Sequence, residues 1–179
     1  THPDIRHMRL AIAHHRDNNM SAALSEMERA LSIRPDDPYY YDLKGQILME
    51  NRRWSAALEA YETANTLAPD EPLILGGLGR AQLAAGQLKA GLNSLEKARS
   101  RDFRDIRVMY DLAIAYAKDG QTGMAALITA ERFALQGNLQ DAGLHARRAV
   151  AQLPRGSSAW QRAQDVLIAS DKFQKGKKR

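Results

Sequence analysis

Histidine is the residue type in this chain best suited to bind a metal ion or to move protons near neutral pH, and there are five. His7, His14 and His15 could share one face of a helix, because steps of seven and eight residues return to the same side. A helical zinc site of the H-E-x-x-H type needs ligands four residues apart, and no histidine here is followed by Glu. We therefore expect these three to pack at helix edges, His145 to lie on the surface, and no metal site.

A glycine cluster at residues 76–79 has the composition of a phosphate-binding loop. The G-x-G-x-x-G spacing of such a loop starts at Gly77 and fails at Gln82, and no strand is predicted before it. The chain has no cysteine nucleophile and no G-x-S-x-G sequence. The sequence therefore predicts no catalytic residue, no cofactor and no enzymatic activity.

The basic residues gather at two places. Four arginines lie between residues 99 and 107, but Asp102 and Asp105 alternate with them, which favours a solvated loop over a nucleic-acid patch. The net charge is +5, yet residues 172–179 hold five of the 26 bases and no acid, which leaves 21 bases against 21 acids. We expect this basic tail to be disordered and expect no nucleic-acid partner; contact with nucleic acid or anionic lipid is the alternative.

The elements that would position all these residues repeat every 34 residues. Successive copies run over residues 7–35, 41–69 and 75–103. A fixed period of this length is typical of stacked helical units that bury one another's apolar faces, so it predicts a binding surface before an active site. Small residues recur at two places in each copy: Ala11, Gly45 and Gly79, then Ala23, Ala57 and Gly91. They would let helix axes approach closely.

The copies resemble the tetratricopeptide repeat, a helix–turn–helix unit. The second copy carries most of the family's pattern at these positions: Tyr41, Gly45, Leu48, Ala57, Tyr61, Ala64 and Pro69. Lys44 and Arg52 depart from the pattern. The resemblance implies a right-handed superhelix whose concave groove binds a protein or peptide segment.

The period breaks after the fourth unit has begun. Thr129 and Arg132 stand where its second helix should have an aromatic residue and Ala. A fifth unit fits instead if it starts 17 residues after the fourth, so we predict one helix over 122–135 that both units share, with Ala130 and Phe133 buried. Residues 156–158 predict a turn and an N-cap before a last helix, which would cover the end of the stack.

The predicted fold is therefore all-α, with about ten helices, no strand, and a single solenoid over residues 1–171. Its expected parts are units at about 4–37, 38–71, 72–105, 106–135 and 123–156, a capping helix at 158–170, and the tail at 172–179.

The resemblance also implies which residues face the groove, because first-helix positions line it in the family. In this sequence the corresponding positions give the candidate ligand-binding residues: Tyr39, Asp42, Gln46, Arg80, Arg107, Tyr110 and Ile114. Some relatives clamp a C-terminal carboxylate with a Lys/Asn set, which is missing here. Met8, Ile12, Asp42 and Gln46 hold its places.

A closer resemblance rests on three segments, residues 37–46, 123–131 and 153–167. They resemble the C-terminal repeats of bacterial periplasmic metalloprotease–chaperones, whose H-E-x-x-H zinc domain precedes the repeats. This implies client or partner docking in outer-membrane protein quality control, and we expect the chain to be a piece of such a polypeptide.

The alternative function is a free-standing scaffold or adaptor of the cell envelope or secretion machinery. A chain without cysteine is compatible with both periplasm and cytoplasm. No apolar run approaches the length of a membrane span, so we expect no transmembrane segment. The sequence leaves the oligomeric state open.

Overall fold

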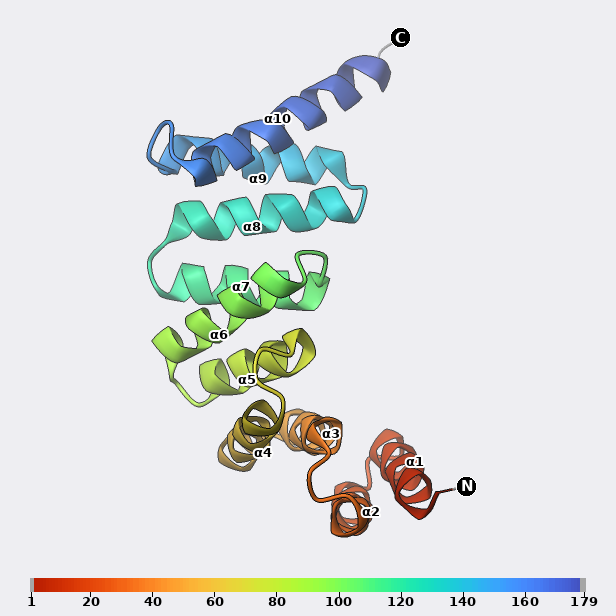
Figure 1. Ribbon diagram of the computed structural model, residues 1–179. Coiled ribbons are helices and arrows are strands. Elements are labelled where there is room, and N and C mark those ends of the chain that lie inside the picture. Colours follow the sequence, from red (N-terminus) through yellow and green to blue (C-terminus); the bar gives the residue numbers. More distant parts are fainter. Residues whose placement is uncertain (1, 178–179) are drawn as a thin grey trace. The chain divides into compact units, whose positions relative to one another are not determined.

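The computed structural model describes residues 2–177, and within them it contains ten α-helices and no strand (Figure 1). The helices are α1 (Pro3–Arg16), α2 (Met20–Ile33), α3 (Pro38–Glu50), α4 (Trp54–Leu67), α5 (Pro72–Ala84), α6 (Leu88–Arg101), α7 (Ile106–Lys118), α8 (Thr122–Leu135), α9 (Leu139–Gln152) and α10 (Ser158–Lys177). The all-α prediction and the number of helices are confirmed.

The helices form two compact units, Thr1–Arg101 with α1–α6 and Asp102–Arg179 with α7–α10. The single solenoid over residues 1–171 that the sequence predicts stays a prediction. The boundary lies beside Phe103, which replaces the closing Pro of the third repeat, and the Phe103 side chain is 61% exposed. A boundary between compact units is expected where an apolar side chain contributes so little packing.

Acid–proline pairs stand at the starts of two helices, α3 and α5. The Asp37 carboxylate accepts hydrogen bonds from the backbone N–H groups of Tyr39 and Tyr40, and Pro38 opens α3. The α5 helix likewise begins at Pro72, although the Glu71 side chain makes no capping bond. Proline at the first helical position favours a helix start at both places, and the Asp37 cap adds to this at α3.

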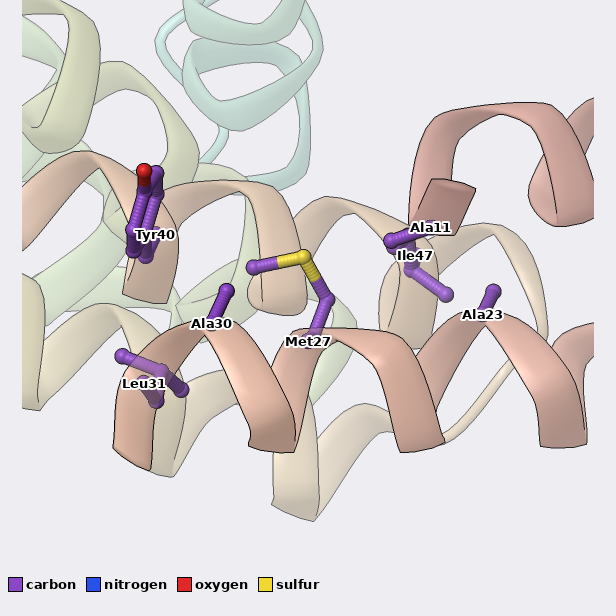
Figure 2. Close-up of a cluster of buried hydrophobic side chains, with 7 residues drawn as sticks. All are labelled: Ala11, Ala23, Met27, Ala30, Leu31, Tyr40 and Ile47. Carbon is purple, nitrogen blue, oxygen red and sulfur yellow. The ribbon is translucent and has the colours of Figure 1, made fainter. Parts of the chain in front are cut away.

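The core of the first three helices gathers small and flexible apolar side chains. Figure 2 shows Ala23, Met27, Ala30 and Leu31 along one side of α2, with side chains of α1 and α3 facing them. Met27 is fully buried, and its flexible thioether suits the irregular space among three helices. The predicted small residues Ala11 and Ala23 are both fully buried here.

Beside this core a tyrosine and a buried carboxylate join α1 to α3. The Tyr40 hydroxyl donates to Asp4 Oδ2 at 2.8 Å, and both residues are buried. This hydrogen bond is the main cause that lowers the pKa of Asp4, while burial and then the same bond raise the pKa of Tyr40. Tyr40 is therefore a structural residue, unlike its exposed neighbour Tyr39.

Glycines permit the close helix crossings that the repeat predicts. A Cβ atom added to Gly79 would lie 3.2 Å from the Gly91 carbonyl oxygen, and one added to Gly91 would lie 3.1 Å from the Gly79 oxygen. On α4, the Tyr61 ring fills the space beside both Gly45 and Gly77. The backbones of α3, α5 and α6 thus approach their neighbours more closely than a side chain would allow.

The second unit contains a helix with the bounds predicted for the shared helix. The α8 helix spans Thr122–Leu135 and packs against α7 on one side and α9 on the other. It also contacts α10 across α9, as α3 contacts α5 across α4. Ala130 is fully buried as predicted, but Phe133 is only partly buried, and its ring stacks on His145.

The last helix is longer than predicted. Ser157 caps it, its hydroxyl accepting a hydrogen bond from the Trp160 N–H, and Gly156 takes a positive φ of 83° in the preceding turn. The helix does not end near Ser170 but continues to Lys177, so residues 172–177 are helical where we expected a disordered tail. Residues 178–179 of that tail lie outside the described residues.

Candidate binding surfaces

The seven predicted groove residues divide between the two units. Tyr39, Asp42 and Gln46 lie on α3 and Arg80 on α5, all in the first unit. The other three, Arg107, Tyr110 and Ile114, lie on α7 in the second. One continuous groove across both sets stays a prediction, so each set is considered by itself.

Two tyrosines stand out within these sets. Tyr39 is 50% exposed and Tyr110 is 54% exposed, although large aromatic side chains on helices are usually more buried. Asp42, Gln46, Arg80 and Ile114 are partly buried, and Arg107 is exposed. An exposed tyrosine held on a helix offers apolar area and a hydroxyl group at a fixed place, which suits it to anchor a partner.

The second unit contains a cavity of about 420 Å³ among α7, α8 and α9. Its α7 side includes the predicted residues Tyr110 and Ile114. Small side chains form much of the wall: Ala113, Ala117, Ala125, Ala126 and Thr129. At one end the Thr122 hydroxyl donates to Gln152 Oε1 at 2.6 Å, which joins α8 to α9. The structure thus brings two of the seven predicted residues into one pocket.

Charged and aromatic side chains crowd the other part of this cavity. The Arg132 guanidinium lies over the Tyr110 ring at 5.4 Å and over the Phe133 ring at 4.7 Å, measured from Cζ to the ring centroids. Phe133 in turn stacks on His145, with centroids 5.5 Å apart and ring planes 18° apart. Arg132 Nε is buried and has no hydrogen-bond partner within residues 2–177.

His145 is less basic than an exposed histidine. Burial is the main cause that lowers its pKa. The positive charges of Arg148 and Arg132 also lower it, whereas the negative charge of Asp141 raises it. At pH 7 the ring is therefore predominantly neutral, and the cations that line the cavity are Arg132 and Arg148. We had expected His145 on the surface, but it is partly buried and lines the pocket.

The sequence did not identify Arg132, His145 and Arg148 as binding residues. A signal was present for the first, because Arg132 and Thr129 occupy the two places where α8 departs from the repeat pattern. A residue that breaks a packing pattern and still lies on the helix has a different environment from its counterparts. His145 and Arg148 carry no comparable signal.

A smaller cavity of about 240 Å³ lies in the first unit among α2, α3 and α4. Lys44, which departs from the repeat pattern, lines it and forms an ion pair with Glu28 at 2.6 Å. Glu59 lies on the same wall. Because acids accompany the base here, this cavity lacks the unbalanced positive charge of the pocket in the second unit.

The N-terminal histidines connect helices. His7 Nδ1 lies 2.6 Å from Glu26 Oε2, and His15 Nε2 lies 2.6 Å from Glu50 Oε2. The bond from His7 is the main cause that lowers the pKa of Glu26. Among the described residues no group of three or more His, Cys, Asp or Glu side chains is arranged to hold a metal ion.

Comparison with known proteins agrees with the helical repeats. Residues 48–108 match the tetratricopeptide repeat family model. No curated protein matches the sequence. No helix in residues 2–177 is both long and apolar enough to cross a membrane.

Several solved structures share the fold at low sequence identity. A thermophilic TPR protein of Thermus thermophilus is 21% identical with a TM-score of 0.59, over 92% of this chain and 99% of that one. MamA from Desulfovibrio magneticus RS-1 is 17% identical with a TM-score of 0.69, over 98% and 97%. PilW, described as a type IV pilus biogenesis factor, is 16% identical with a TM-score of 0.63, over 98% and 94%.

Proposed function

We propose that this chain is a protein-interaction module that binds peptide or protein segments on the first helices of its repeats. The observation that carries this function is the exposure of Tyr39 and Tyr110, two helix-borne aromatic residues at predicted groove positions. Tyrosine is enriched among residues that dominate binding energies, because it combines apolar area with a directed polar group. This function needs no catalytic residue and no cofactor.

Site-specific photo-crosslinking tests this function. A photoreactive phenylalanine analogue at position 39 or 110 should crosslink to partner segments in cell extract. The matched control is the same analogue at Phe103, which is exposed but lies in a loop at the unit boundary. Equal crosslinking from all three positions, or none from positions 39 and 110, would contradict the proposal.

The finer form of the proposal is that this module docks clients or partners for a periplasmic metalloprotease–chaperone in outer-membrane protein quality control. Its support is the resemblance of residues 37–46, 123–131 and 153–167 to the repeats of such proteins. Mass spectrometry of the native polypeptide, purified from separated cell fractions, tests it. Peptides with an H-E-x-x-H sequence should belong to the same polypeptide, and that polypeptide should be in the periplasmic fraction.

The second candidate is a free-standing scaffold or adaptor of the cell envelope or secretion machinery. The observation that favours it is the likeness to PilW, which extends over nearly the whole of both chains. A native polypeptide with a mass close to 19.9 kDa would support this candidate over the protease-linked one.

A further inference from the structure

We propose that the pocket among α7, α8 and α9 binds an acidic peptide segment in which a carboxylate side chain lies next to an apolar one. This inference rests on the proposed protein-binding function and names the chemistry of the partner. The Glu or Asp would meet Arg132 and Arg148, and its apolar neighbour would fill the space along Ile114.

The charge of the pocket selects an anion. Arg132 and Arg148 line the cavity, and its lining residues include neither Asp nor Glu. The smaller cavity of the first unit shows the contrast, because there Lys44 is already paired with Glu28. Positive charge in a lining that holds no acid attracts a complementary charge on the partner and speeds association.

Arg132 is positioned as a hydrogen-bond donor. Its guanidinium lies over the rings of Tyr110 and Phe133, and the stack of Phe133 on His145 fixes one of those rings. Arginine can donate two parallel hydrogen bonds to one carboxylate, so a guanidinium held in place at the cavity suits an acidic side chain of the partner.

The rest of the pocket fits an apolar side chain. Four alanines and the partly buried Ile114 form an apolar wall beside Thr122, Thr129 and Gln152, and the volume of about 420 Å³ exceeds that of a single side chain. A lone inorganic anion would leave this apolar wall uncovered, whereas a segment with an acid beside Leu or Phe would cover both parts. The proposed ligand is therefore an internal part of a chain, with an acid and an apolar residue side by side.

The first experiment is selection from a peptide pool. The probe is a pool of dodecapeptides of random sequence, acetylated at the N-terminus and amidated at the C-terminus. Any carboxylate in such a peptide therefore belongs to a side chain. The wild-type protein should enrich peptides with an acid beside an apolar residue. Enrichment without acids, or enrichment that appears only when the peptide C-terminus is left as a free carboxylate, would overturn the proposal.

The second experiment compares variants with one enriched peptide and its Glu→Gln counterpart, by fluorescence anisotropy. Arg148→Gln and Arg132→Gln should each raise Kd by about tenfold or more, the size expected when a charged hydrogen-bond partner is lost. Arg132→Lys should recover only part of the affinity, because lysine cannot donate two parallel bonds. Arg148 is exposed, so that variant tests the proposal even if Arg132→Gln impairs folding.

The matched control is Arg147→Gln, on the same helix one residue away. Arg147 is also exposed but forms an ion pair with Asp171 on α10 at 3.3 Å and does not line the pocket. Its replacement should leave Kd unchanged. If Arg147→Gln and Arg148→Gln weaken binding equally, the effect is one of general charge and the pocket is not the site.

The two proposals fail in different ways. Crosslinks from positions 39 and 110 without any acid preference in the pool would reject the pocket ligand and keep the protein-binding function. Crosslinks from neither position, together with no enrichment, would reject both.

Discussion

The ring of Tyr61 occupies the space that a side chain at Gly45 would need. A Cβ atom added to Gly45 would lie 2.7 Å from Tyr61 Cε2, closer than real Cβ contacts. Tyr61 is 3% exposed and packs against Leu58 and Leu78, so the ring has little room to move away. The crossing of α3 and α4 therefore depends on the absence of a side chain at position 45.

Gly45→Leu should destabilise the chain by about 2–3 kcal/mol, because overpacking forces helices or rotamers out of place. The measurement is chemical denaturation followed by circular dichroism. Gly176→Leu is the matched control, since nothing lies within 4 Å of an added Cβ at that helical glycine. An unchanged free energy of unfolding for Gly45→Leu would show that α3 and α4 do not cross as described.

Tyr40→Phe should destabilise the chain in a pH-dependent way. The Tyr40 hydroxyl is the main cause that holds the pKa of Asp4 below its ordinary value of 3.8. A carboxyl group with a lowered folded-state pKa contributes stability above its unfolded-state pKa, and loses it as the pH falls through the folded-state value. The Tm deficit of Tyr40→Phe should therefore be full above about pH 5 and shrink progressively at lower pH.

The control for that pH series is Tyr39→Phe, since Tyr39 is 50% exposed. It should show no pH-dependent difference from the wild type. A Tm deficit of Tyr40→Phe that stays constant down to the lowest pH would mean that the charge of Asp4 is not involved.

Arg52→Gly should stabilise the first unit by up to about 1 kcal/mol, because a side chain in the left-handed region is strained and glycine is not. Arg52 has φ of 59° in the turn after α3, where the repeat pattern has glycine. Asn18→Gly is the comparison: Asn18 has φ of 56°, but asparagine tolerates this region and should gain less. Equal effects in thermal melts of the two variants would argue against backbone strain at Arg52.

Arg162→Ala should loosen α10 from the second unit. Arg162 Nε and Nη2 each lie 2.7 Å from a carboxylate oxygen of Glu131 on α8, a paired geometry that single surface contacts lack. Its loss should cost about 1–3 kcal/mol, because Glu131 is left partly buried with fewer partners. Faster amide hydrogen exchange in α10 would report the loosening.

Asp171→Ala is the control for that ion pair. Asp171 lies on α10 and forms an exposed ion pair with Arg147 on α9. Because exposed ion pairs contribute little, its replacement should change stability by less than about 1 kcal/mol. If both variants behave alike, the Glu131–Arg162 geometry has no special weight.

The repeat period predicted the helices well, because small and apolar residues at fixed spacing determine which faces can pack. The α8 helix has the predicted bounds, and Gly45 and Gly79 lie at close crossings. Arg132 was visible only as an exception to the pattern, since its role comes from rings brought together by folding. The helical state of residues 172–177 could not be read from a run of bases, which is equally typical of a disordered tail.

The dual role of α8 bears on how such an array can grow. This helix packs on α7 as the second member of one pair and on α9 as the first member of the next. Because one surface pattern satisfies both neighbours, a duplication or deletion need not involve a whole helix pair. The unit of evolutionary change in this part of the chain can be a single helix, added or lost without leaving an apolar face uncovered.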